Sequence, residues 1–312
     1  MEGGVTGSCV RDTVTVRVPA TTANLGPGFD CLALTLDLWN QATFTLGGSG
    51  LEISVAGEGA GRLARDRSNM VAQALARFFV AHGEPAPSGL RIDCQVAVPL
   101  SSGLGSSASA ALAGILAANT LLGEPADRDE VLRLAADVEG HPDNVAAALF
   151  GGLVMVVRNG DRLLTRRVEI PPLSVALAVP ELDVSTSALR AELPGTVSRA
   201  DAVFNLGRTA LVVQALQDGD LELLGLVMED KLHQSHRLAH IPGGAEAMAA
   251  ARAAGAAAVA LSGSGPSLIA FVPAGTSAAD VAAAMTAALG EAGVPARQLV
   301  LATTAEGARV TA

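Results

Sequence analysis

The feature that most constrains the fold is a strand, a glycine-serine loop and a helix in direct succession. Residues 90–98 alternate apolar and polar side chains, the period of a half-buried strand, and Pro99 ends this run. Residues 100–106 are rich in serine and glycine, and the alanine-rich residues 107–122 end at Gly123, as a helix commonly does. The sequence therefore predicts an α/β unit whose glycine-rich loop leads into a helix.

This loop has the chemistry of a phosphate site. Residues 103–107 (GLGSS) bring together unpaired backbone N–H groups and the positive end of a helix dipole, which bind phosphate without a lysine. The Walker pattern is absent because no Gly-Lys-Ser/Thr follows, and the dinucleotide fingerprint is not completed after Gly105. The alternative is a flexible connection, which the flanking strand and helix disfavour.

Charge, hydropathy and cysteine usage exclude several classes of partner. The net charge is −10 and Lys231 is the only lysine, so the basic surface that a nucleic-acid backbone requires is missing. No apolar run reaches the ~18 residues of a membrane span. Cys9, Cys31 and Cys94 are odd in number and widely spaced, which suits free thiols in a reducing compartment. With a polar N-terminus that shows no secretory signal, we expect a cytoplasmic protein.

The length favours two domains, because 312 residues exceed the size at which a single core usually stops growing. Pro171 and Pro172 follow a charged stretch and precede a new strand, so we place the domains at 1–170 and 171–312. Periodicity and capping residues predict a strand at 13–18 ended by Pro19, a helix started by Ser68, helices at 128–139, 145–150, 202–217, 221–233, 245–254 and 278–289, and strands at 153–157, 173–179, 257–261 and 268–272.

Four segments, in order along the chain, resemble the motifs of the GHMP kinases. Residues 99–108 (PLSSGLGSSA) resemble their ATP-binding motif, and residues 261–267 (LSGSGPS) resemble their late glycine motif. Residues 19–30 (PATTANLGPGFD) and 139–145 (EGHPDNV) are similar to the opening and middle motifs of the homoserine kinase branch. Together the segments span nearly the whole chain, and the second pair is specific to that branch.

This resemblance implies a fold and a reaction. The fold is α+β, with an N-terminal α/β domain that holds the glycine-rich phosphate loop, a C-terminal ferredoxin-like domain, and the substrate between them. The reaction uses ATP and Mg²⁺ and transfers the γ-phosphoryl group to the side-chain hydroxyl of L-homoserine. The product, O-phospho-L-homoserine, leads to threonine.

For the nucleotide, the resemblance implies a loop site made of Pro99, Leu100, Ser101, Ser102, Gly103, Leu104, Gly105, Ser106, Ser107, Ala108 and Ser109, with Asn69 at the adenine. The alternative for Asn69 is a helix cap. It also implies Ser107 and Glu139 as metal ligands. A negative charge in the last turn of a helix is unfavourable by roughly 0.3–1 kcal/mol, so Glu139 calls for a partner such as a cation. The alternatives are a solvated helix end for Glu139, and Asp137 as the metal ligand.

An amino acid substrate needs an arginine for its carboxylate and a carboxylate for its ammonium group. The resemblance implies Arg190 and Arg237 for the first, and Asn24 and Asp30 for the amino end. Without the family resemblance, such arginines would be read as solvated surface charges, and Asn24 and Asp30 as ordinary turn residues.

Around the reacting hydroxyl the resemblance implies His141 and Asn144, with Ser107 and Glu139 completing the catalytic set. Without it, His141 is a loop histidine and Asn144 a turn residue. Other GHMP kinases place an aspartate as base where Asn144 stands, and an amide cannot take a proton at neutral pH. We therefore hypothesise that Asn144 orients the hydroxyl and that the proton leaves late, without a base, while Asp143 is the fallback base.

Two rival functions remain open at this point. One is the same reaction on another alcohol, such as a sugar, a mevalonate-like compound or shikimate, which the set of two arginines and one aspartate argues against. The other is a non-catalytic ligand sensor, which the intact glycine loop and metal ligands argue against. We also expect a homodimer.

Overall fold

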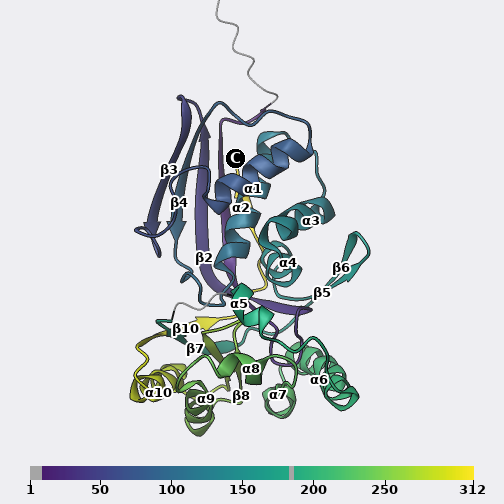
Figure 1. Ribbon diagram of the computed structural model, residues 1–312, viewed down its shortest axis with the longest axis vertical. Helices are drawn as coiled ribbons and strands as arrows, with labels where there is room; N and C mark the ends of the chain where they lie inside the picture. The colour runs from purple at the N-terminus through teal and green to yellow at the C-terminus, as the bar shows by residue number, and fades with distance from the viewer. Residues whose placement is uncertain (1–8, 183–185) are drawn as a thin grey trace, which may run out of the picture.

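The computed structural model describes residues 9–182 and 186–312, which form two sheets in opposite halves of the molecule (Figure 1). The first sheet has the strand order β11-β1-β2-β4-β3, and β5 joins it through β2 and carries β6. Its strands are β1 (Thr13–Ala23), β2 (Leu32–Leu46), β3 (Gly50–Gly57), β4 (Gly89–Val96), β5 (Leu153–Asn159), β6 (Arg162–Val168) and β11 (Arg309–Thr311). Only the β3–β4 pair is parallel.

Helices pack beside this sheet, as Figure 1 shows. They are α1 (Met70–Ala81), α2 (Ser106–Leu121), α3 (Arg128–Glu139) and α4 (Pro142–Phe150). Central α2 is buried on nearly every side and contacts β1, α1 and α3, which explains why its sequence is apolar all round. The core of Phe44, Phe78, Ile92 and Leu112 fixes α2, and so fixes where its N-terminus points.

The second sheet is antiparallel throughout, with the order β10-β7-β9-β8. Its strands are β7 (Ser174–Pro180), β8 (Ala258–Leu261), β9 (Leu268–Val272) and β10 (Ala296–Ala302). Its helices are α5 (Thr186–Ala191), α6 (Arg199–Asp218), α7 (Leu221–Val227), α8 (Gln234–Leu238), α9 (Gly244–Ala253) and α10 (Ala278–Glu291). This βαββαβ arrangement confirms the predicted ferredoxin-like half and the two-part α+β fold.

The second sheet is buried on both faces. Ala176 and Ala178 of β7 pack with α9 and α10, whereas Val175 and Leu177 pack with α6, α7 and apolar residues of the first half such as Leu34. A shared apolar cluster therefore holds the two halves against each other.

The two sheets separate between Val168 and Ser174, on either side of the two prolines. The last strand, β11, returns to pair with β1 of the first sheet. We keep the domain limits 1–170 and 171–312 as a proposal. By these limits β11 belongs to the second domain, although it pairs with the sheet of the first. None of the helices in the described ranges has the length and apolar character needed to cross a membrane.

The predicted ends of two elements were wrong. Pro19 does not end the first strand, because β1 absorbs it next to a register shift at Pro19/Ala20, a position where a missing N–H is tolerated. The predicted helix 221–233 stops at Val227. The carboxylate of Asp230 accepts the N–H groups of Leu232 and His233, so these donors do not continue the helical ladder.

Candidate active site

A cavity of about 670 Å³ opens between the start of α2 and segments from both halves of the molecule. Most of the residues predicted for the site meet there, namely Asn24, Asp30, Asn69, Leu100, Ser101, Ser102, Gly103, Gly105, Ser106, Ser107, Ser109, Glu139, His141, Asn144, Arg190 and Arg237. Pro99, Leu104 and Ala108 are buried and do not line it.

The glycines of the loop are required by close packing as well as by conformation. Gly103 and Gly105 have φ of 78° and 73°, which side chains rarely adopt. A Cβ on Gly103 would lie 2.1 Å from the carbonyl oxygen of Ser262, and one on Gly105 would lie 2.0 Å from Oγ1 of Thr21. Gly105 is the N-cap of α2 and offers no side-chain acceptor, which leaves the first-turn N–H groups for a ligand.

The late glycine segment supports this loop from the second half. Ser262 Oγ donates to the carbonyl oxygen of Gly103 at 2.8 Å, and Ser267 N donates to that of Ser102 at 3.2 Å. Two motifs separated by about half of the chain therefore form one structural unit.

Asn69, rather than Ser68, is the N-cap of α1, so the alternative of a helix cap holds for Asn69. Its Oδ1 accepts from Val71 N at 3.0 Å and its Nδ2 donates to Ala64 O at 2.7 Å, so backbone groups already occupy both ends of the amide. Asn69 still lines the cavity, and its role at the adenine stays a prediction. Met70 lies beside it at this end of the cavity.

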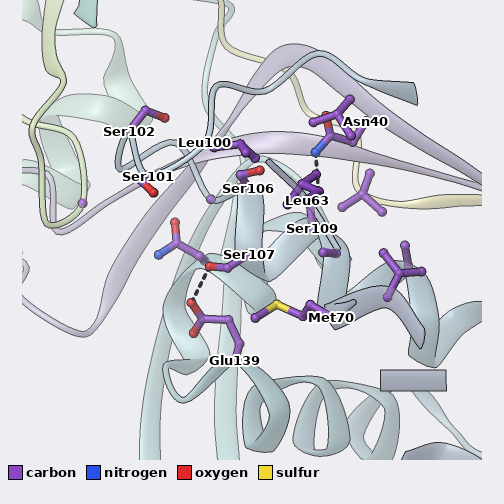
Figure 2. Close-up of a pocket in the computed structure, with 18 of the residues that line it drawn as sticks. Asn40, Leu63, Met70, Leu100, Ser101, Ser102, Ser106, Ser107, Ser109 and Glu139 are labelled. Carbon is purple, nitrogen blue, oxygen red and sulfur yellow. Dashed lines mark hydrogen bonds between the residues drawn. The ribbon is translucent and has the colours of Figure 1, made fainter. Parts of the chain in front are cut away.

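A polar corner forms where α3 ends opposite the start of α2. Figure 2 shows Ser107 and Glu139 pointing toward each other, and Ser107 Oγ donates to Glu139 Oε1 at 3.1 Å. Glu139 Oε2 accepts from the backbone N–H of His141 at 2.7 Å, and its side chain is only 10% exposed. Glu139 is therefore not a solvated helix end. Asp137 does not line the cavity and pairs with Arg133 on the surface.

His141 stands beside this acid. Its Nδ1 lies 3.4 Å from Glu139 Oε2, and the hydrogen bond to Glu139 raises the pKa of His141, against the opposing effect of burial. The imidazolium form is thus favoured relative to a free histidine.

Asn144 is held in one orientation. Thr21 Oγ1 donates to its Oδ1 at 2.8 Å, and its Nδ2 donates to Asp143 Oδ1 at 3.3 Å. Asp143 is 3% exposed, and burial, with repulsion from Asp30 and Glu139, raises its pKa to about 6. The amide is therefore fixed from both sides, next to a carboxyl group that ionises reluctantly.

Opposite charges meet at the far end of the cavity. Arg190 Nη2 donates to Oδ1 and Oδ2 of Asp30 at 2.6 and 2.7 Å. Asn24 Oδ1 accepts the backbone N–H of Asp30 at 3.0 Å, while Asn24 Nδ2 donates to Gly263 O at 2.7 Å. Arg237 is only 2% exposed and lies 5.2 Å from the ring centroid of Phe29.

Comparisons with known proteins identify the family. The GHMP kinases N terminal domain family matches residues 69–152, and the GHMP kinases C terminal family matches residues 212–291. A homoserine kinase from Moorella thermoacetica is 48% identical over 257 residues, which cover 82% of this chain and 86% of that protein. One from Trichormus variabilis is 43% identical over 303 residues, which cover 96% and 99%. The chain belongs to the homoserine kinase family.

Solved structures agree with this membership. The crystal structure of a homoserine kinase from Cytophaga hutchinsonii has a TM-score of 0.85 at 31% identity and covers 97% of this chain and 98% of its own. A mevalonate kinase from L. major, with a TM-score of 0.65 at 17% identity, covers 98% of this chain and 100% of its own and shares the fold. The resemblance of the four motifs is thereby confirmed, and the chain is a kinase of the ATP-using GHMP type.

The structure adds site residues that the sequence did not single out. Thr21 lies within the opening motif but acts on Asn144, 123 residues away. Asn40 from β2 accepts the N–H groups of Ala97 and Val98 and donates to Ser109 Oγ, so it fixes the approach to the loop (Figure 2). An asparagine inside an otherwise regular strand was the one local signal available.

Proposed function

We propose that this kinase transfers the γ-phosphoryl group of ATP to the side-chain hydroxyl of L-homoserine and so makes O-phospho-L-homoserine, a precursor of threonine. The observation that carries the proposal is one cavity with a phosphate-binding helix start at one end and an Asp30–Arg190 pair at the other. The first suits a nucleotide, and the second suits a zwitterion.

For the nucleotide, the N–H groups at the start of α2 would hold the phosphates. Ser107 and Glu139 fit a magnesium ion, because a hydroxyl and a carboxylate oxygen already meet at 3.1 Å at the cavity wall. Mg²⁺ commonly takes one or two protein oxygens and completes its shell with water and phosphate, so these two protein oxygens are adequate. When bound, it would neutralise the charge that develops on the phosphate oxygens.

For homoserine, Arg190 and Arg237 would take the carboxylate, and Asp30, positioned by Asn24, would take the ammonium group. Arg237 supports this because its buried Nε has no hydrogen-bond partner within the described part of the chain. A buried guanidinium N–H without an acceptor destabilises the protein, and a bound anion such as a carboxylate would remove this penalty.

At the reacting hydroxyl, Asn144 would orient the oxygen toward the phosphate, because Thr21 and Asp143 fix its amide. His141 would add positive character beside it. We propose that no side chain removes the proton completely and that it leaves late, to a phosphate oxygen.

One assay tests the proposed function. Purified protein with ATP and Mg²⁺ should release ADP with L-homoserine, but much more slowly with L-serine, shikimate or galactose. If a neutral alcohol such as galactose released ADP as fast as L-homoserine does, the proposal that homoserine is the substrate would be wrong. Binding of L-homoserine without any ADP release would favour the ligand sensor.

We also propose a cytoplasmic location and a homodimer. Cys9, Cys31 and Cys94 are free thiols, which suits a reducing compartment. Val203 and Leu206 of α6 are 62% and 71% exposed on one helix face, as a surface that pairs with a second copy would be. Light scattering of the purified protein tests the dimer: a monomer at micromolar concentration would contradict it.

A further inference from the structure

The segment between α7 and α8 is built around a buried acid. Asp230 Oδ1 accepts from Asn205 Nδ2 at 2.7 Å, and its Oδ2 accepts from the backbone N–H groups of His233 and Gln234 at 2.8 and 2.7 Å. The side chains of Asp230 and His233 are fully buried. This arrangement fixes the backbone from which His233 and Arg237 project.

The hydrogen bonds of His233 determine its tautomer. Nε2 lies 2.9 Å from the carbonyl oxygen of Gly26, and since a carbonyl can only accept, Nε2 carries the proton. Nδ1 is then a free acceptor, and Arg237 Nη1 lies 3.3 Å from it. Burial lowers the pKa of His233 to about 4, against the opposing charge of Asp230, so the ring is neutral at pH 7.

Arg237 is thereby held at one nitrogen. Its Nη1 contacts two acceptors, His233 Nδ1 and Gly263 O, each at 3.3 Å. Phe29 stacks on the ring of His233 at 4.9 Å and lies beside the guanidinium of Arg237, which limits rotation of both. The buried Nε, without a partner in the described structure, remains for a ligand in the cavity that Arg237 lines.

We infer that His233, as the neutral Nε2–H tautomer, is a positioning residue that orients Arg237 toward the carboxylate of the amino acid substrate. The inference rests on the proposed function. His233 also ties the loop that carries Asn24, Phe29 and Asp30 to the helix that carries Arg237, because its two ring nitrogens contact one segment each. Orientation of the carboxylate in this enzyme thus depends on a side chain that does not touch the substrate.

Two amide substitutions separate the two contacts of the imidazole. His233→Asn places an amide oxygen near the position of Nδ1 and keeps an acceptor for Arg237, whereas His233→Gln reaches the position of Nε2 and keeps only the contact with Gly26. A hydrogen bond to a charged group is worth about 10-fold to 100-fold in binding, so His233→Gln should raise the KM for L-homoserine by at least about 10-fold. The KM for ATP should change less than twofold, and His233→Asn should raise the homoserine KM less than His233→Gln does.

His236 provides a matched control, because it is an exposed histidine on the same short helix. His236→Gln should leave both KM values unchanged. Equal rises in the homoserine KM for the two His233 variants, or an ATP KM that rises in step, would show a structural role and overturn the inference.

A measurement on the wild-type protein does not depend on how the variants fold. Histidine ¹⁵N NMR spectra recorded from pH 5 to 8 should show one ring that does not titrate and is protonated at Nε2 alone. A proton on Nδ1 of that ring, or the lack of any ring with this behaviour, overturns the inference. If wild-type protein does not phosphorylate L-homoserine, the proposed function fails instead, and this ring signature still reports on His233 itself.

Discussion

The buried carboxyl of Asp143 makes the stability of this protein depend on pH. Its pKa is raised from 3.8 to about 6, chiefly by burial, while the backbone N–H of Asn144 at 2.8 Å opposes the rise. A carboxyl whose folded pKa exceeds its unfolded pKa stabilises the fold below the unfolded value, and this contribution is lost as the pH rises through about 6. Between pH 5 and 8, Asp143 should therefore destabilise the protein progressively.

The size of the effect follows from the two pKa values. A rise from 3.8 to about 6 corresponds to about 3 kcal/mol, since each pH unit is worth about 1.36 kcal/mol. Because pH 5 lies only about one unit below the folded pKa, about 1.4 kcal/mol of this is lost between pH 5 and 8. Asp143→Asn has no charge to bury and keeps an oxygen for the N–H of Asn144. Its free energy of unfolding, relative to wild type, should rise by about 1.4 kcal/mol over this pH range.

Urea unfolding at pH 5, 6, 7 and 8 measures this difference for wild type and variant. Asp137→Asn is the matched control, because Asp137 lies on the neighbouring helix with its side chain 40% exposed. Its difference from wild type should not show the rise between pH 5 and 6, with a plateau above about pH 7, that Asp143→Asn should show. A difference for Asp143→Asn that is constant with pH would refute the assignment of a raised pKa to Asp143.

The same variant tests the base-free hypothesis. Asp143→Asn should retain phosphoryl transfer within about 10-fold, because it keeps the contact that orients Asn144 and loses only the ability to take a proton. Asn144→Ala should lose more in kcat, since it removes the amide that orients the hydroxyl. A loss of several orders of magnitude in Asp143→Asn alone would make Asp143 the base.

Two further substitutions address the nucleotide end. Glu139→Gln should lower kcat by at least about 100-fold and raise the Mg²⁺ concentration needed for half-maximal rate, whereas Asp137→Asn should leave both unchanged; the reverse result would move the metal ligand to Asp137. Gly105→Ala should lower kcat by about 100-fold, because its Cβ would displace Thr21. Gly83→Ala is the control, because Gly83 has a similar φ of 71° and open space around it, and it should lower stability by only about 1–2 kcal/mol. A wild-type rate for Gly105→Ala would show that the close approach of Gly105 to Thr21 does not position the catalytic groups.

Local patterns predicted most of the interior elements, although not the central strand β2, and missed several strands at the edges of the sheets. Helix α3 was predicted at the residues where it is found, because capping, periodicity and a terminal glycine agree there. The sequence of β6 gives only a charged stretch before the two prolines, because this strand pairs with β5 alone and exposes its arginines, as edge strands do. The pairing of β11 with β1 joins the two ends of the chain, and no local pattern encodes such a contact.

The site shows the same division. Motifs located the phosphate loop and Glu139, because each is a short run whose chemistry is visible in its own residues. The sequence could not show that Thr21 fixes Asn144, or that Asp30 and Arg190 bond to each other, because these contacts link segments 123 and 160 residues apart.

We propose that the pairing of Asp30 with Arg190 is the means by which the site selects a zwitterion. Their side chains are 38% and 37% exposed, and a pair of this kind contributes only about 0–1 kcal/mol, so it can be exchanged at little cost. A bound amino acid would replace it completely, with its carboxylate on the guanidinium of Arg190 and its ammonium group on Asp30. A neutral alcohol would leave the pair closed, and a substrate with one charge would open it and leave the other partner unmatched. On this proposal, discrimination against sugars and other neutral alcohols arises from the exchange of one ion pair for two.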